Sequence, residues 1–348
     1  MLEKSPGPLD SPLLRDESRL SGWAERIIIP QDSRAASETV IKALEEACPM
    51  TFQGARTGLT GAGVPLGGLL INSSRLDKAQ SLRLGPEGFE IKLQSGYPLA
   101  ELRRALALRR VNFSDQAIGP DLLAEFRARE LFWPPDPGES GASIGGLVST
   151  NAAGPNRAKF GATRAYVSAL TAVLGQGQEY ELNRGDFVFG QAGLPLPWGG
   201  FLDIEPGHLG LGPGADFLDL LIGFQGMGGF VSSVWLKLKK APAYHWALVF
   251  FLDSQEKAAA FIEKSLLDQL EALVSLDFLD EASLKVIAEL GQSAKKLKEL
   301  PSPPSSARSA VLMELMAEDE FLIERASERI LANCQAVGGD PDHSWALV

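Results

Sequence analysis

Apolar and polar positions in the first 110 residues alternate between strand spacing and helix spacing. The run ERIIIP at 25–30 is short, apolar and closed by a proline, which predicts a strand. Asp32 or Ser33 can cap a following helix that carries Val40, Ala43 and Leu44 on one face. The same pattern predicts two further strands and a second helix, namely GGLLINSS at 67–74, FEIKL at 89–93 and a helix that starts at Pro98.

Between 132 and 240 the pattern consists of strands separated by glycine-rich segments. VSALTAVLGQGQEYEL at 167–182 predicts two strands around a glycine turn, and residues 230–238 predict a third strand. Residues 183–218 are rich in glycine and proline and show no clear periodicity, so we expect a long loop there.

After KAPAY at 240–244 strands and helices follow one another regularly. The expected strands are 246–252, 274–279 and 310–315, and the expected helices are 254–270, 281–290 and 318–336. Asp280 is expected to cap the second of these helices. If that helix is an insertion, the order is β-α-β-β-α, which is one strand short of a split βαβ sandwich. SWALV at 344–348 is the segment left to supply the last strand.

Length and charge narrow the class of protein. A chain of 348 residues predicts two domains, and its apolar fraction of 45% is that of a globular protein. The net charge of −11 would repel a polyanion, so we expect no nucleic-acid partner.

The cysteines and histidines exclude several kinds of site. Two cysteines, Cys48 and Cys334, cannot build a disulfide framework or a cysteine-ligated iron–sulfur cluster. The histidines at 208, 245 and 343 lack ligand spacing, so no metal site is expected. The cysteine usage favours the cytoplasm, and no segment resembles a signal peptide or a membrane span. We therefore expect a cytoplasmic protein, at most peripheral to the inner membrane face through a partner.

The segment TFQGARTGLTGAGVPLGG at 51–68 is unusually rich in glycine. Backbone N–H groups without side chains in the way can hold an anion, which favours phosphate binding over the alternative of a plain surface loop. No lysine follows these glycines as a P-loop requires, and the G-x-G-x-x-G spacing of a Rossmann turn is missing. The segment therefore predicts a nucleotide site of another design.

Four motifs in this order resemble those of the FAD-linked oxidase family, which includes D-lactate dehydrogenases and the FAD subunits of glycolate oxidase. They are FQGARTGLTGAGVP at 52–65, PPDPGESGASIGGLVSTNAAG at 134–154, KFGATRAYV at 159–167 and LIGFQGMGGFV at 221–231. The resemblance covers residues 16 to about 242. It implies an α+β protein: an arm at 1–22, a two-subdomain FAD-binding domain of the p-cresol methylhydroxylase type at 23–242, and an incomplete ferredoxin-like cap, apparently truncated, at 243–348.

The resemblance also implies which residues hold FAD. The first loop would wrap the pyrophosphate, the second segment would run along the cofactor toward the flavin, and Val231 would offer a backbone contact. The residues concerned are Gly54, Ala55, Arg56, Thr57, Gly58, Thr60, Gly61, Pro135, Asp136, Ser143, Gly145, Gly146, Ser149, Asn151 and Val231. Arg56 would offset the diphosphate charge, the alternative being a solvated loop arginine. Thr57 and Gly58 occupy the region where some relatives carry a tethering histidine, so FAD would be noncovalent.

The implied activity is hydride transfer from a 2-hydroxy acid such as D-lactate or glycolate, with electrons passed to an acceptor protein or a quinone. The sequence departs from the family in three places. Residues 206–223 lack a Lys-Asn…Gly-Tyr segment, Gln225 and Met227 replace a glutamate and a threonine, and the histidine motif expected after the cap is missing. No catalytic residue is therefore assigned. Two alternatives remain: an accessory, noncatalytic FAD subunit whose cap a second subunit completes, or a fragment of a longer enzyme.

Overall fold

The structure is a computed structural model that describes residues 2–4, 12–191, 193–212, 214–291 and 303–347. Part of the predicted arm, residues 1 and 5–11, lies outside this range, as does Val348. Contacts between residues separate the chain into two compact units. Unit 1 comprises residues 1–154 and 162–240, and unit 2 comprises residues 155–161 and 241–348.

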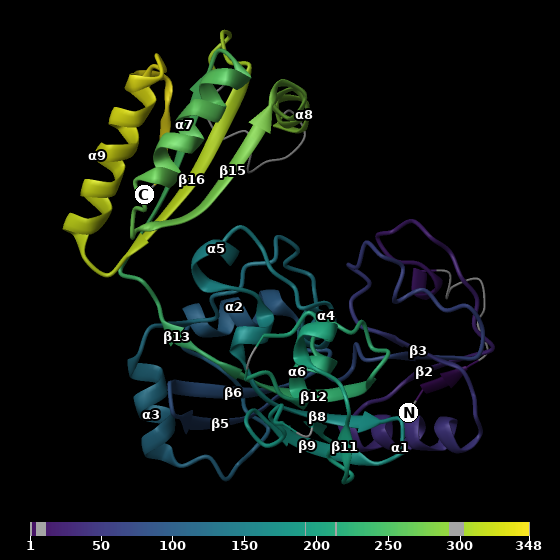
Figure 1. Cartoon of the computed structure of the whole chain (residues 1–348). Helices are drawn as coiled ribbons and strands as arrows, with labels where there is room; N and C mark the ends of the chain where they lie inside the picture. The colour runs from purple at the N-terminus through teal and green to yellow at the C-terminus, as the bar shows by residue number, and fades with distance from the viewer. Residues whose placement is uncertain (1, 5–11, 192, 213, 292–302, 348) are drawn as a thin grey trace. The chain divides into compact units, whose positions relative to one another are not determined.

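Unit 1 contains a small, mostly parallel sheet at its N-terminal side (Figure 1). Its strands, in spatial order, are β1 (Leu2–Lys4), β2 (Arg26–Ile29), β4 (Leu69–Asn72) and β3 (Met50–Gln53). The predicted strands at 25–30 and 67–74 are confirmed as β2 and β4. Because β2, β4 and β3 are parallel, their carboxyl ends meet at one edge of the sheet, where the first glycine segment begins.

A five-stranded antiparallel sheet forms the rest of the core of unit 1. Its strands, in spatial order, are β5 (Ala79–Gly85), β6 (Gly88–Gln94), β12 (Gly229–Lys237), β8 (Val167–Leu174) and β9 (Glu179–Asn183). The predicted strands at 89–93, within 167–182 and at 230–238 are thus confirmed as β6, β8, β9 and β12. Strand β12 lies in the centre of the sheet although it comes last in sequence, and it carries the third glycine cluster at its start.

Helix α1 (Ser33–Glu45) joins the two sheets of unit 1. The Asp32 side chain caps it by accepting a hydrogen bond from the Ala35 N–H at 2.8 Å, as one of the two predicted caps. Its buried face packs into one cluster with residues of both sheets, including Ile71 from β4 and Val173 from β8. The small sheet is thereby held against the large one through a shared apolar core.

The other helices and short strands of unit 1 lie around these sheets. They are α2 (Leu99–Ala107), α3 (Pro120–Ala128), α4 (Ile144–Thr150), α6 (Phe217–Leu221), β7 (Leu131–Phe132), β10 (Leu194–Pro195), β11 (Phe201–Leu202) and β13 (Lys239–Lys240). The expected long loop at 183–218 is mostly loop, with one small hairpin of β10 and β11 and the start of α6.

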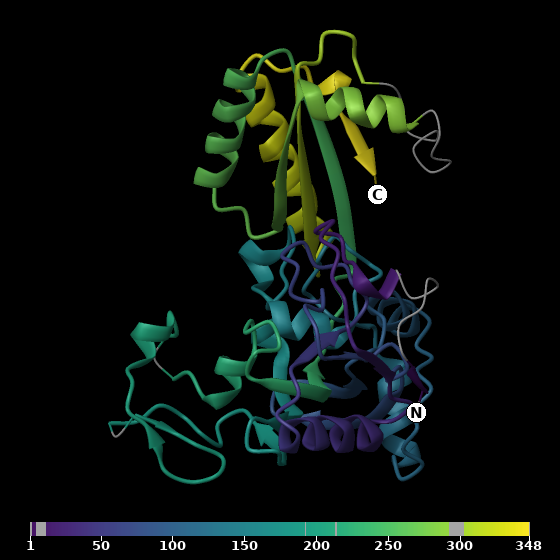
Figure 2. The ribbon, with the colours of Figure 1, turned by 90° about the vertical axis from the view of Figure 1, so that its right-hand side faces the viewer.

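Unit 2 is a four-stranded antiparallel sheet with helices on it (Figure 2). Its elements are α5 (Arg157–Phe160), β14 (Tyr244–Leu252), α7 (Gln255–Leu267), β15 (Leu273–Asp280), α8 (Glu281–Gly291), β16 (Ser309–Ala317), α9 (Glu320–Ala336) and β17 (Trp345–Leu347). The strand order β15-β16-β14-β17 is that of a split βαβ sandwich, and the predicted segment at 344–348 supplies the short edge strand.

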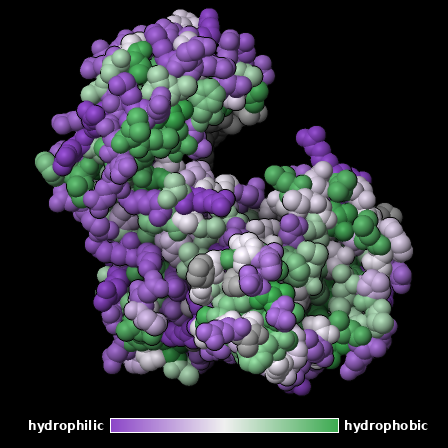
Figure 3. Space-filling view, viewed as in Figure 1, coloured by the Kyte–Doolittle hydropathy of each residue, from purple (hydrophilic) through white to green (hydrophobic). Residues whose placement is uncertain are grey.

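The helices of unit 2 cover the two faces of the sheet unequally. Helices α7 and α9 pack on one face through Phe261 and Ile330, whereas α8 packs on the other through Leu284. Asp280 caps α8 as predicted, accepting a hydrogen bond from the Ser283 N–H at 2.7 Å. Hydrophilic residues cover most of the outer surface of α9, as its amphipathic pattern predicts (Figure 3). Among the described residues, no helix is both long enough and apolar enough to cross a membrane.

Candidate functional site

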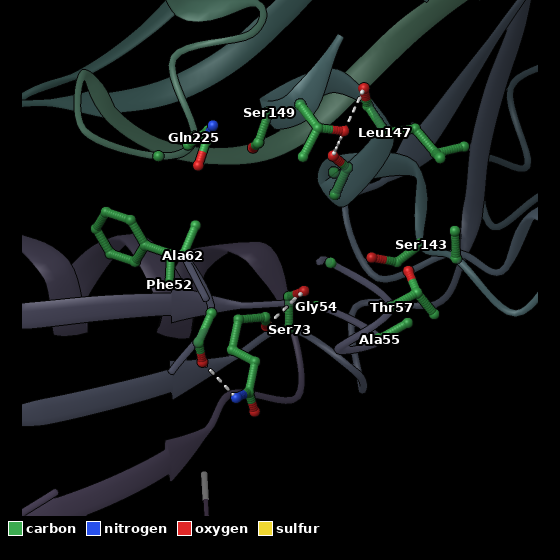
Figure 4. Close-up of a pocket in the computed structure, with 18 of the residues that line it drawn as sticks. Phe52, Gly54, Ala55, Thr57, Ala62, Ser73, Ser143, Leu147, Ser149 and Gln225 are labelled. Carbon is green, nitrogen blue, oxygen red and sulfur yellow. Dashed lines mark hydrogen bonds between the residues drawn. The ribbon is translucent and has the colours of Figure 1, made fainter. Parts of the chain in front are cut away.

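The three glycine-rich segments, far apart in sequence, line one pocket in unit 1 with a volume of about 230 Å³. The first segment follows β3, the second contains α4, and the third leads into β12. Figure 4 shows Gln225 and Ser149 on the opposite side of the open space from Phe52 and Ala62. Strand β3 pairs with β4 and strand β12 pairs with β8. These pairings fix the positions of the first and third glycine-rich segments, which are far apart in the sequence.

Hydrogen bonds from buried polar side chains set the shape of the first glycine loop. The Gln53 amide donates to Gly63 O at 2.7 Å, which closes the loop between its two ends. The Asn72 amide donates to Gln53 Oε1 at 2.9 Å and to Gly54 O at 3.2 Å. These bonds hold the loop at the carboxyl edge of the small sheet without using its N–H groups.

The N–H groups of residues 55–62 are available for a ligand. Within the described chain, none of them donates to a backbone carbonyl or to a side chain. Two residues of the loop take left-handed backbone angles, Gly61 with φ of 77° and Arg56 with φ of 67°. Such a run of free N–H groups is the arrangement that binds phosphate groups in loops.

The second segment places two buried hydroxyl groups at the pocket. Ser143 precedes α4 and is 4% exposed, and Ser95 follows β6 and is 3% exposed. Both hydroxyl oxygens are buried without a hydrogen-bond partner among the described residues. The Gly145 N–H donates to Ser95 O at 2.7 Å, so the two serines are held on adjoining walls. An unpaired buried hydroxyl is costly, which points to a polar ligand in this pocket.

The third segment is tied to both of the others through Gln225. Its N–H donates to Ser149 O at 2.7 Å, and its side-chain oxygen accepts a hydrogen bond from the Thr60 hydroxyl at 3.2 Å. The adjoining Gly226 approaches Phe52, whose ring centroid lies 5.3 Å from that of Phe230. The pocket therefore has an apolar wall of aromatic rings beside its polar glycine loops.

A buried ion-pair network supports the third segment from behind. The Arg164 guanidinium donates to Asp219 O at 2.6 Å and to Asp219 Oδ1 at 2.9 Å, and it also bonds Ile222 O. Arg184 reaches Asp219 Oδ2 at 3.1 Å. Burial acts to raise the pKa of Asp219, but the hydrogen bonds from Arg184, the Asp216 N–H and Arg164 outweigh it and leave that pKa lowered. Asp219 therefore remains charged and anchors α6 beside the pocket.

Most of the residues predicted to hold the cofactor line this pocket. They are Gly54, Ala55, Arg56, Thr57, Gly58, Thr60, Ser143, Gly145, Gly146, Ser149 and Val231.

The remaining four predicted residues do not line it. Gly61 faces the arm, where a Cβ atom would lie 2.7 Å from Leu20 Cδ1. Pro135 is buried, and Asp136 forms an ion pair with Arg103. Asn151 ends α4 in a left-handed conformation, and its side-chain oxygen accepts a hydrogen bond from the Arg164 N–H at 2.9 Å.

Arg56 lines the pocket but also contacts the arm. Its guanidinium donates to Pro12 O at 2.6 Å, while its own carbonyl accepts a hydrogen bond from the Glu17 N–H at 3.2 Å. The side chain is half-buried rather than fully solvated. Its role toward a diphosphate remains a prediction.

Several lining residues were not predicted from sequence, chief among them Asp16, Phe52, Ser73, Ser95, Thr150, Gln225 and Phe230. Gln225 could have been proposed from the sequence, because it replaces the glutamate that the resembled family carries in the third glycine cluster. Phe52 and Phe230 follow the apolar pattern of their strands, so nothing in the pattern separates them from core residues. Ser95 and Asp16 lie outside all four motifs.

The residues present fit an FAD molecule. Free N–H groups in the first loop suit the diphosphate, the unpaired serine hydroxyls suit polar groups of the cofactor, and the aromatic wall suits a flat ring. At Gly54 a Cβ atom would lie 2.2 Å from Ser143 Oγ, so glycine keeps this part of the pocket open.

Comparison with known proteins agrees with this assignment. Residues 24–117 and 117–183 match the model of the FAD binding domain family. The chain is 28% identical over 322 residues to D-lactate dehydrogenase of Anaerostipes hadrus, covering 91% of this chain and 58% of that protein. It is 25% identical over 313 residues to glycolate oxidase subunit GlcD of Bacillus subtilis (strain 168), covering 89% of this chain and 55% of that subunit. The chain therefore spans little more than half the length of these relatives.

The fold is also that of a solved structure. An alkyldihydroxyacetonephosphate synthase superposes with a TM-score of 0.68 at 11% identity, over 99% of this chain and 57% of that one. At this identity the likeness concerns the fold alone. Residues 24–183 thus contain an FAD-binding domain, and the chain is similar to FAD-linked oxidoreductases named D-lactate dehydrogenase and glycolate oxidase subunit.

Proposed function

We propose that the protein oxidises a small 2-hydroxy acid, of the D-lactate or glycolate kind, with noncovalently bound FAD. The observation that carries the proposal is the single pocket formed by three glycine-rich segments, with free N–H groups and unpaired serine hydroxyls. The names of the relatives, a D-lactate dehydrogenase and a glycolate oxidase subunit, supply the substrate class. Unit 2 would serve as the ferredoxin-like substrate domain, and its sheet has the four strands of that fold, because β17 supplies the strand that the sequence pattern left in question.

Each part of the pocket has a role in this proposal. The N–H groups of residues 55–62 would bind the diphosphate, and Ser95 and Ser143 would donate hydrogen bonds to the cofactor. The link between Thr60 and Gln225 would keep the first and third segments together around it. When bound, FAD supplies a two-electron acceptor for the hydride on the hydroxyl-bearing carbon of the acid. The electrons would pass on to an acceptor protein or a quinone.

A specific observation favours a second candidate, an accessory FAD subunit of a multi-chain oxidase. The described residues that line the pocket include no histidine, lysine or tyrosine, and their carboxylates are Asp16 and Glu139. A base that takes the hydroxyl proton of the substrate would then come from outside this lining, such as from a second subunit. The two free cysteines agree with work in the cytoplasm or at the inner membrane face through such a partner.

Anaerobic mixing of the FAD-loaded protein with a panel of D- and L-2-hydroxy acids tests the proposal. We expect one of them to bleach the flavin absorbance, with reoxidation restoring it. Flavin that stays oxidised with every acid, but bleaches once a partner subunit is added, would support the accessory role instead. Purified protein that takes up no FAD would contradict both candidates.

A further inference from the structure

The N-terminal arm packs beside the FAD pocket and contributes Asp16 to its lining. Pro12 and Leu13 accept hydrogen bonds from the side chains of Arg56 and Gln53, at 2.6 and 2.8 Å. Leu13 and Leu14 pack on a small core cluster with Ile27 of β2. The match to the FAD binding domain family begins at residue 24, so this part of the arm precedes the matched residues.

Asp16 is the residue by which the arm reaches the pocket. Its Oδ1 atom accepts hydrogen bonds from the Ser18 N–H at 3.0 Å and from the Ser18 hydroxyl. Its Oδ2 atom is buried and has no hydrogen-bond partner among the described residues. Oδ2 lies 3.9 Å from the position of a Cβ atom at Gly58, beside the first glycine loop. Ser18 therefore holds Oδ1 of Asp16, whereas Oδ2 can accept a hydrogen bond from a ligand in the pocket.

The chemistry of this oxygen narrows what it binds. A buried carboxylate oxygen without a partner costs more than a neutral group in the same place, so it is expected to meet a donor when the pocket is filled. The diphosphate is an anion and would be repelled by Asp16. The neutral donors on FAD beside the diphosphate are the hydroxyl groups of the ribityl chain and of the ribose.

We propose that Asp16 accepts a hydrogen bond from a sugar-type hydroxyl of bound FAD, so that the arm before the matched domain supplies a cofactor ligand. The inference rests on FAD binding to this pocket and does not depend on which acid is oxidised. Arg56 and Gln53, by holding Pro12 and Leu13, act as positioning residues for Asp16.

The test compares FAD affinity of apoprotein variants by flavin fluorescence titration. Asp16→Asn keeps an oxygen for the Ser18 N–H but replaces the free acceptor with an NH₂ group. Asp16→Ala removes both. We expect the Kd for FAD to rise several-fold in Asp16→Asn and about 10-fold or more in Asp16→Ala, the usual range for a hydrogen bond to a charged group. Glu17→Gln makes the same charge change at the exposed neighbouring residue and should leave the Kd unchanged.

A second readout separates a ligand from a structural residue. Asp16→Asn keeps the acceptor for Ser18 and loses only the unpaired one, so the urea stability of its apoprotein should equal that of the wild type, whereas a purely structural Asp16 would make it fall. Titration of the Asp16 variants and the wild type with FMN and with ADP identifies the hydroxyl. FMN binding that is weaker in the variants indicates the ribityl chain, and ADP binding that is weaker in the variants indicates the ribose.

Two outcomes would overturn the inference. A Kd for FAD that is unchanged in Asp16→Ala shows that Asp16 is not a ligand. A Kd that falls in Asp16→Asn shows that the carboxylate repels the diphosphate. Wild-type protein that binds no FAD would instead refute the cofactor assignment itself, whereas wild-type protein that binds FAD but oxidises no 2-hydroxy acid leaves this test intact.

Discussion

The glycines around the pocket differ in the room that lies beside each α carbon. At Gly58 the nearest atom to an added Cβ would be Asp16 Oδ2 at 3.9 Å, which is ordinary contact. At Gly145 the same atom would lie 2.6 Å from Ser95 Cβ, and at Gly54 2.2 Å from Ser143 Oγ. A side chain at position 58 would therefore fill space in the pocket, whereas a side chain at position 145 would clash with Ser95.

Gly58→Val should remove FAD binding while sparing the fold. The valine side chain meets little around Gly58 and fills space that the cofactor needs. We expect at least a tenfold rise in the Kd for FAD, equivalent to about 1.4 kcal/mol, with a change in unfolding free energy of about 0.5 kcal/mol or less. Fluorescence titration and urea unfolding measure the two quantities. Gly119→Val, at a site with open space around it, serves as the control, and normal FAD affinity in Gly58→Val would contradict the pocket assignment.

Glu87 should make stability depend on pH. Its carboxylate accepts hydrogen bonds from Lys237 at 2.6 Å and Lys239 at 2.8 Å, which lower its pKa from 4.5 to about 2. Because the folded pKa is below the unfolded one, these pairs stabilise the fold above pH 4.5 and lose this effect as the pH falls toward 2. The Glu87 side chain is 51% exposed, so solvent screening limits the effect to about 1 kcal/mol.

Urea unfolding of Glu87→Gln between neutral pH and about pH 3 checks this prediction. The variant should be less stable than the wild type at neutral pH, and the difference should shrink as the solution becomes acidic. Glu45→Gln, at an exposed position of α1, should show a difference that does not change with pH. A Glu87→Gln difference that is as large in acid as at neutral pH would disprove the assignment.

At the scale of elements, the position of α4 against the end of β6 decides where the second glycine segment lies. The Gly145 N–H bonds Ser95 O at 2.7 Å, and α4 approaches so closely that its first turn has room for no side chain at this residue. Glycine is a poor helix former, so local preference does not explain this helix. Its packing on β6 does, and it carries Ser149 into the pocket.

Gly145→Ala and Gly146→Ala test this contact as a matched pair. Both place alanine in the first turn of α4, so both gain the same helix preference. At Gly145 the new atom would lie 2.6 Å from Ser95 Cβ and 2.9 Å from Ser95 O, whereas at Gly146 it would lie 3.3 Å from the rotatable Ser143 hydroxyl. We expect Gly145→Ala to lose about 2 kcal/mol in urea unfolding and Gly146→Ala to change little. Equal stability of the two variants would count against this packing.

At the scale of the whole molecule, every residue that lines the pocket belongs to unit 1. Hydrogen exchange with and without FAD should therefore show protection in residues 52–63, 142–152 and 225–231, with little change in β14 and β16 of unit 2. Protection of equal size in both units would contradict a site confined to unit 1. Saturating FAD should also raise the unfolding free energy, by about 2.7 kcal/mol at 100 times the Kd.

Much of this fold could be predicted because its signals are local. The apolar run of β2, the Asp32 cap of α1 and the alternation in β6 each depend on a few neighbouring residues. Strand β3 and helix α4 were not predicted. Proline and glycine flank β3, and α4 contains two adjacent glycines near its start. Their stability comes from pairing with β4 and from packing on β6, and neither partner is adjacent in sequence.

The sequence by itself determined the cofactor class, through four motifs that resemble those of FAD-linked oxidases, and the order of most of the elements, because motifs and hydrophobic periodicity lie in contiguous residues. Only the tertiary structure decided which side chains complete the pocket. Asp16, Ser95 and Gln225 come from the arm, the end of β6 and the turn before β12, and strand pairing and loop packing bring them to one place. Their burial and unpaired oxygens exist only once these distant segments meet, so no local pattern could have shown them.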